Sequence, residues 1–178
     1  MSLKEFQFQN KSIPYYHFFY KGDFYKDLRA KNMVLADGTR INSFFNQKTF
    51  EQHNFDQPYV RLRKAAMFIV HYFPDQIGRD LDNYIYKPVI DSLRKTGIFF
   101  DDTWQNISLF LLGDYAEQEK IEVFLVPHSS AAVFMQECMG ERFQSESTFN
   151  EIVYPQNTDL IQTQEKDNNN KRKLTSFW

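Results

Sequence analysis

The pattern of hydrophobic and polar positions is clearest over residues 59–73, where the chain becomes strand-like. The end of this stretch, Met67-Phe68-Ile69-Val70, is continuously apolar. Continuous apolar runs suit an interior strand that is covered on both faces. Pro74 closes the strand, because proline cannot donate to a central ladder of hydrogen bonds. The pattern therefore predicts one interior strand of a sheet.

Three further stretches have strand character. Loose alternation predicts a first strand over 3–9, and apolar runs predict two more over 106–112 and 121–126. The polar segment 113–120 between the last two predicts a hairpin loop.

The same patterns predict helices between and after these strands. The helices are expected over about 26–46 with a break at Asp37-Gly38, from Pro88 to a glycine cap at Gly97, and from Ser129 or Ser130 to Phe143. The polar segment 48–58 predicts a loop. The fold class is therefore α/β in the α+β sense, with a small mixed β-sheet and helices packed on it. We expect a main domain over 1–127, a C-terminal helix over 128–144 and a polar, unstructured tail over 145–178.

An aromatic-rich segment from Pro14 to Phe24 allows two interpretations. Its aromatic residues are Tyr15, Tyr16, Phe18, Phe19, Tyr20 and Phe24. Packing in the core or under a loop is the ordinary role of such side chains. Stacking on unpaired bases is the alternative, although the residues show no phasing that favours it.

The composition argues against a disulfide-bonded, zinc-binding or membrane-spanning protein. The chain has 178 residues, a formal net charge of −2 and one cysteine, Cys138. A single cysteine forms no internal disulfide and has no partners at zinc-binding spacing. We find no apolar run long enough to span a bilayer and no leading apolar segment, so we expect a soluble cytoplasmic protein without a membrane partner. Nucleic-acid binding would require a local basic patch.

Carboxylates are concentrated between residues 79 and 102. Asp80 and Asp82 are two positions apart and would point to the same side of an extended segment, whereas Asp101 and Asp102 would point to opposite sides. Carboxylates gathered this closely repel one another unless a positive group lies between them. Magnesium prefers such oxygens, and Lys87 could orient a phosphate. The alternative is a purely structural role, in which these residues only cap helices and form turns.

The acidic residues lie in a locally basic stretch. Between Arg61 and Lys95 there are seven basic residues and four acids. The basic residues that we assign to DNA contacts are Arg61, Arg63, Lys64, Arg79, Arg94 and Lys95. Metal ligands with phosphate contacts around them suit a nuclease. Asp91 is as well placed to pair with Arg94 or Lys95 as to act in catalysis, and His71 is expected to be a satisfied histidine of the sheet.

These motifs resemble the RusA-type Holliday-junction resolvase family. The resemblance rests on Arg79-Asp80-Leu81-Asp82-Asn83, Lys87-Pro88, Asp91-Ser92-Leu93, Gly97 and Asp101-Asp102, over about two dozen residues. It implies a homodimer of mixed α/β domains that cuts four-way or branched DNA with magnesium or manganese, typically in phage or prophage recombination. By motif, Asp80, Asp82 and Asp102 would be the metal-binding catalytic acids and Lys87 the catalytic lysine. Asn83, Asp91 and Asp101 would support them.

One spacing departs from the family pattern. Lys87 follows Asp82 by five residues, where the family usually has four. On a regular helix four positions separate two side chains by about 40° around the axis, and five by about 140°. Either the turn before Pro88 absorbs the extra residue or Lys87 is displaced. A displaced lysine favours a second hypothesis, a junction-binding protein with this fold and no cleavage activity. A third is a structural protein that does not bind DNA.

The C-terminal tail lies outside the resemblance. Its last residues loosely resemble a sliding-clamp-binding peptide, with Leu174 and Phe177 as apolar anchors. A solubilising or DNA-touching tail is the alternative.

Overall fold

The computed structural model describes residues 3–24, 34–35, 37–56, 58–75, 77–78, 80–81 and 86–144. By its internal contacts the chain divides into two units, Met1–Gly140 and Glu141–Trp178. Of the second unit only the last residues of one helix are described. The predicted clamp anchors Leu174 and Phe177 therefore lie outside the described residues.

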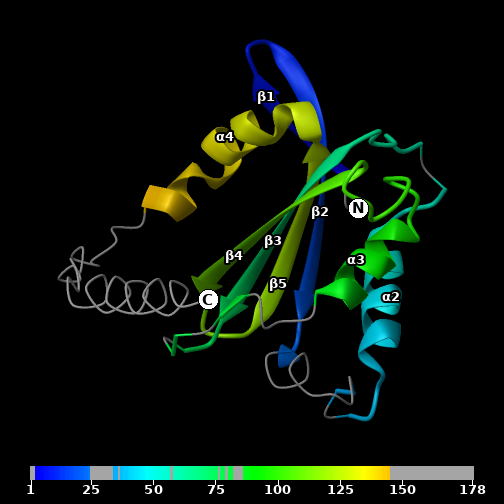
Figure 1. The fold of residues 1–178 in the computed structure, drawn as a ribbon, viewed down its shortest axis with the longest axis vertical. Helices are drawn as coiled ribbons and strands as arrows, with labels where there is room; N and C mark the ends of the chain where they lie inside the picture. Colours follow the sequence, from blue (N-terminus) through cyan, green and yellow to red (C-terminus); the bar gives the residue numbers. More distant parts are fainter. Residues whose placement is uncertain are drawn as a thin grey trace, which may run out of the picture. The chain divides into compact units, whose positions relative to one another are not determined.

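The first unit is built on a mixed five-stranded sheet (Figure 1). In chain order the elements are β1 (Leu3–Phe8), β2 (Lys11–Lys21), α2 (Ile41–Gln52), β3 (Ala65–Phe73), α3 (Lys87–Arg94), β4 (Ile107–Tyr115), β5 (Lys120–Pro127), η2 (His128–Ser130) and α4 (Ala131–Gln144). The strand order is β1-β2-β5-β3-β4, and only the β3–β4 pair is parallel. The expected fold class, a mixed sheet with helices packed on it, is confirmed.

The interior strand is β3, as the apolar run predicts. All nine of its residues are buried, and it lies between β5 and β4. It begins at Ala65 rather than at residue 59, because the preceding segment bonds elsewhere. The hydroxyl of Tyr16 donates to the carbonyl of Val60 and accepts from its N–H, at 2.9 and 2.8 Å. Val60 therefore uses both backbone groups on a side chain and extends no ladder.

The predicted hairpin between the last two strands is wrong. β4 and β5 do not pair with each other, because β3 is inserted between them. A strand that is apolar on both faces needs neighbours on both edges, whereas β4 exposes Leu109 and Tyr115 and tolerates an edge position. The first strand is confirmed, and the aromatic segment forms β2, which the alternation did not predict.

The helices are shifted relative to the predicted ranges. α2 runs from Ile41 to Gln52, so it starts late within the range 26–46 and extends into the predicted loop. α3 begins at Lys87 with Pro88 in its first turn, as predicted. Gly97 has a φ of 75°, the left-handed conformation that favours glycine after a helix. None of the helices in the described residues is long and apolar enough to cross a membrane.

Two apolar layers cover the sheet. On one face, residues of α2 and α3 such as Phe45 and Leu93 pack against alternate residues of β3. On the other face, Phe134 and Met139 of α4 pack against Phe68 and its neighbours. Figure 1 shows α2 and α3 together on one side of the sheet and α4 on the other. Four aromatic residues of the 14–24 segment belong to the first layer: Tyr16, Phe18, Tyr20 and Phe24. They are core, as in the ordinary interpretation.

A chain of hydroxyl groups ties β2, α2 and α3 together inside this core. The Tyr20 hydroxyl lies 2.8 Å from Thr49 Oγ1, which lies 2.9 Å from Ser92 Oγ. Ser92 donates its only hydroxyl proton to the carbonyl of Val89 at 2.7 Å. Thr49 must therefore donate to Ser92, and Tyr20 to Thr49. Each buried hydroxyl is satisfied, and the direction of the chain is fixed.

Replacing the middle member of this chain should destabilise the protein. Thr49→Val leaves the buried Tyr20 hydroxyl without its acceptor, so we expect the free energy of unfolding to fall by about 1–3 kcal/mol. Ser43→Ala, which removes a hydroxyl at an exposed position of the same helix, should change it little. Urea unfolding followed by circular dichroism measures both. Equal stability of the two variants would show that the chain of hydroxyls contributes nothing.

Candidate active site and an adjoining basic pocket

Tyr86, the residue directly before α3, fixes the first turn of this helix. The carbonyl of Tyr86 accepts hydrogen bonds from the N–H groups of Val89 and Ile90, at 3.0 and 3.1 Å. Its hydroxyl lies 3.2 Å from Nδ1 of His71, a buried residue of β3. Tyr86, the residue before Lys87, is therefore attached both to the first turn of α3 and to the sheet.

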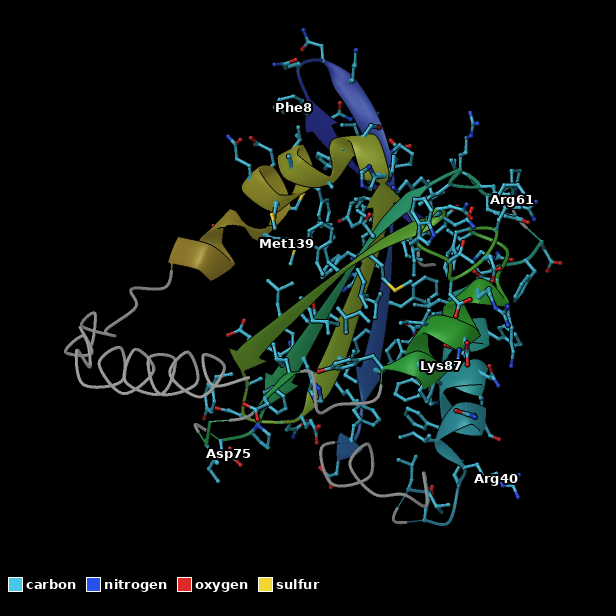
Figure 2. The ribbon with its side chains drawn as sticks, viewed as in Figure 1. Phe8, Arg40, Arg61, Asp75, Lys87 and Met139 are labelled. Carbon is cyan, nitrogen blue, oxygen red and sulfur yellow. The ribbon has the colours of Figure 1, made fainter. Side chains whose placement is uncertain are left out.

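Lys87 brings two carboxylates together. Its Nζ donates to Asp91 Oδ1 at 3.0 Å and to Asp102 Oδ2 at 3.4 Å. The pairing with Asp91, and then with Asp102, raises the pKa of the Lys87 ammonium group above its usual value. The lysine side chain is 68% exposed, so it remains open to a further ligand. Figure 2 labels Lys87 on α3.

The two adjacent aspartates have different partners. Asp101 Oδ1 accepts from the backbone N–H of Asp102 at 2.9 Å and from Arg94 Nη1 at 3.2 Å. The Asp102 N–H, and after it Arg94, lowers the pKa of the Asp101 carboxyl group. Asp101 thus closes its own turn and pairs with the helix. Asp102 is the one of the two that reaches Lys87.

The described residues do not bring the predicted metal ligands into one group. Asp80 is exposed. The side chain of the next residue, Leu81, packs closely against Gly113 of β4: it lies 3.3 Å from the position that a Cβ atom would take on this glycine. Asp82, Asn83 and Arg79 lie outside the described residues. Within the part of the chain that the structure describes, no three His, Cys, Asp or Glu side chains gather closely enough to hold a metal ion. The convergence of Asp80, Asp82 and Asp102 stays a prediction.

The chemistry of the described carboxylates nevertheless fits a hard divalent cation. Asp102 offers an oxygen-only donor group that is only partly exposed. Its Oδ2 pairs with the lysine ammonium group.

A buried network below the site was missed by sequence reasoning. His71 Nε2 lies 2.6 Å from Glu119 Oε1, and both side chains are almost fully buried. With a carboxylate accepting at Nε2, a neutral His71 carries its proton there and accepts the Tyr86 hydroxyl at Nδ1. His71 is thus a satisfied histidine of the sheet, as expected. Glu119 is 48 positions away along the chain, and no local pattern links the two residues.

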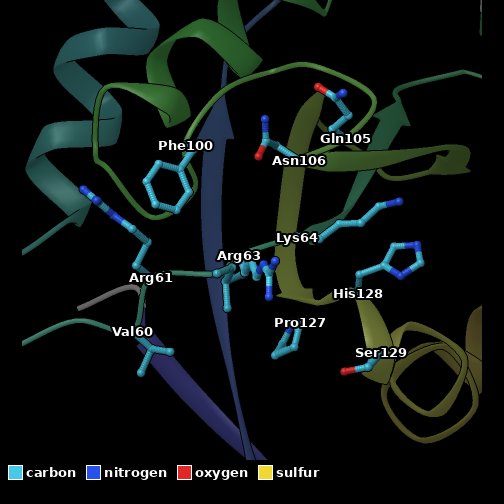
Figure 3. A pocket seen from close by; sticks show the side chains of 11 residues that line it. Val60, Arg61, Arg63, Lys64, Phe100, Gln105, Asn106, Pro127, His128 and Ser129 are labelled. Atoms are coloured by element: carbon cyan, nitrogen blue, oxygen red, sulfur yellow. The ribbon is translucent and has the colours of Figure 1, made fainter.

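A basic pocket of about 900 Å³ lies at the amino end of β3 (Figure 3). Arg61, Arg63, Lys64 and His128 contribute positive or titratable groups, and no Asp or Glu is among the described residues that line it. Leu62 between the two arginines is buried in the core, so the arginines on either side of it face outwards. Three of the predicted DNA contacts therefore gather in one pocket.

The other predicted DNA contacts that the structure describes lie at the end of α3 and have partners there. Arg94 pairs with Asp101, and Lys95 Nζ donates to Asn46 Oδ1 at 3.0 Å. They lie outside the residues that line the pocket.

Removing the Tyr86 hydroxyl should weaken the attachment of α3 to the sheet. Tyr86→Phe loses the hydrogen bond to His71, so we expect a loss of about 1–2 kcal/mol in the free energy of unfolding. Tyr115→Phe, at an exposed position of β4, is the matched control and should have little effect. Guanidinium unfolding of both variants measures the difference. A Tyr86→Phe protein as stable as the control would contradict this role.

Comparison with known proteins gives no family for this chain. No protein-family model matches the sequence, and no curated protein matches it. The functional argument therefore rests on the residues of the site and on their geometry.

Proposed function

We propose that the protein is a magnesium-dependent endonuclease that cuts branched DNA, with four-way junctions as the substrate and a homodimer as the active form. One observation carries the proposal. Lys87 and Asp102 are 15 positions apart in the chain, yet Lys87 Nζ lies 3.4 Å from Asp102 Oδ2. These are two of the residues to which the resemblance to the RusA-type family assigns catalytic roles, and they lie side by side. The longer spacing between Asp82 and Lys87 does not remove the lysine from Asp102.

The exposed ammonium group has a direct part in the reaction. A scissile phosphate that reaches Lys87 finds a charged donor already oriented by Asp91 and Asp102. The ammonium group is charged at neutral pH, and pairing with Asp91 and then Asp102 raises its pKa further, so it can stabilise the negative charge that develops on the phosphate. A magnesium ion held by Asp80, Asp82 and Asp102 would supply polarisation of the phosphodiester and activation of water.

The basic pocket supplies the remaining contacts to DNA. Phosphate contacts position a duplex, and an acidic site repels DNA unless cations lie around it. Phe100 of the pocket precedes Asp101 and Asp102 directly in the chain, so one loop serves both regions. Arg61, Arg63 and Lys64 therefore hold the strand that enters the site.

A specific observation favours a second candidate, a protein that binds junctions without cutting them. The Lys87 ammonium group already lies between Asp91 and Asp102, so a positive group separates these two carboxylates without a metal ion. This candidate predicts metal-independent binding and no cleavage.

Cleavage of a synthetic four-way junction separates the two candidates. With magnesium, the wild-type protein should nick two opposite strands symmetrically. Asp102→Asn should reduce the cleavage rate at least about 100-fold, because it removes a charge that holds the metal and the lysine. Junction binding, measured by gel shift in EDTA, should persist. Asp56→Asn, at an exposed position outside the site, is the matched control.

Lys87→Met tests the lysine separately. We expect a loss of cleavage with retained binding and an almost unchanged melting temperature, because the ammonium group is exposed and water screens its ion pairs. Lys48→Met, which breaks an exposed ion pair on α2, is the control for loss of a surface charge. Junction binding with no cleavage by the wild-type protein in magnesium or manganese would select the second candidate.

A further inference from the structure

Two aromatic side chains are largely exposed to water: Phe100, which lines the basic pocket, and Trp104, which directly precedes the lining residue Gln105 in the chain. Phe100 is 62% exposed and Trp104 is 79% exposed. Both lie in the connection between α3 and β4, which also supplies Gln105 and Asn106 to the pocket. Two large aromatic side chains left in water within five residues of each other, next to a concentration of cations, form a surface that suits a ligand with flat faces and negative charge.

The ring of Phe100 is already paired with a cation. The guanidinium carbon of Arg61 lies 4.8 Å from the ring centroid, and Figure 3 shows the two side chains at one side of the pocket. Arg61 Nε donates to the carbonyl of Gly97 at 3.0 Å, which fixes the orientation of the guanidinium group. The terminal nitrogens of Arg61 are the donors that a phosphate would take. A planar cation and an aromatic ring are thus held together before any ligand arrives.

The backbone around the pocket is also fixed. Leu62 N–H donates to the carbonyl of Ile98 at 2.7 Å, and Leu62 forms an isolated bridge with Phe99. His128 N–H donates to the carbonyl of Lys64 at 3.0 Å. The basic segment is therefore bonded on one side to the loop that carries Phe100 and on the other to the end of β5.

We infer that this pocket, with Phe100 in its lining and Trp104 in the same loop, binds unpaired nucleotides of a single DNA strand. Arg61, Arg63 and Lys64 contact the phosphates, and the two rings stack on bases. This inference rests on the proposed function and deepens it, because it names the feature of a branched substrate that is recognised, the unpaired bases at the branch point. A duplex hides its base faces and needs only the cations, whereas exposed rings gain from bases that are free to stack.

Tryptophan fluorescence gives a direct test. The sequence has two tryptophans, Trp104 and Trp178, so Trp178→Phe leaves Trp104 as the single reporter. Titration with an oligothymidylate in EDTA should quench its fluorescence. Heparin, a polyanion without bases, should bind through the cations and leave the fluorescence nearly unchanged. Equal quenching by heparin and by the oligonucleotide would overturn the inference.

Substitution of the second ring completes the test. In the same background, Phe100→Ala should weaken binding of the oligonucleotide about 5- to 100-fold and leave heparin binding unchanged, since a base-stacking ring contributes that much per base. Tyr115→Ala removes an equally exposed ring at the far end of β4 and should change neither affinity. Unchanged oligonucleotide binding by Phe100→Ala would overturn the inference.

The two proposals fail in different ways. The titration contains no magnesium, so it does not depend on cleavage. A protein that cuts junctions while Trp104 ignores the oligonucleotide keeps the nuclease function and loses this binding site. A protein that shows base-dependent quenching without cutting keeps the binding site and loses the nuclease function.

Discussion

The burial of β3 on both faces is the constraint on which the rest of the structure depends. Each fully buried side chain of the size of Phe68 or Ile69 contributes about 1.5–3 kcal/mol that an edge position would partly lose. The strand therefore needs neighbours on both edges and a helical layer on both faces. A parallel partner requires a crossover, and α3 supplies it while covering one face. The position of Lys87, the first residue of α3, follows from this arrangement.

The ion pairs at the start of α3 are not explained by stability. Water screens an exposed lysine strongly, and holding long side chains in one geometry costs conformational entropy. The hydroxyl chain through Thr49 and the buried pair of His71 and Glu119 satisfy groups that would be costly to leave unpaired, so those contacts belong to the fold. Lys87 gathers two carboxylates where the fold has no need of them. The proposed function gives this arrangement a use, the binding of a charged phosphate.

Local patterns predict those parts of the fold that local physics decides. The apolar run at residues 67–70 predicts the interior strand, and Gly97 predicts a left-handed turn after α3, although the helix itself ends earlier, at Arg94. Each of these features depends on residues close in sequence. Pairing is not local: β4 and β5 look like a hairpin until β3 is placed between them. The candidate site divides in the same way. Spacing and motif single out Lys87 and Asp102, whereas the pocket at residues 60–64 forms only when segments distant in sequence meet.

The loop from Ile98 to Asn106 connects the two kinds of chemistry. Two side chains of this loop contact different cations: Asp102 pairs with Lys87, and the ring of Phe100 packs against the guanidinium group of Arg61. An acidic site alone would repel DNA. Cations alone would bind the DNA backbone at any position along its length. Under the proposed function, placing both on one anchored loop would fix the distance between a bound DNA strand and the reacting group. Holding a substrate close to a reacting group accelerates a reaction most when the loop is already ordered, because no conformational entropy is then lost on binding.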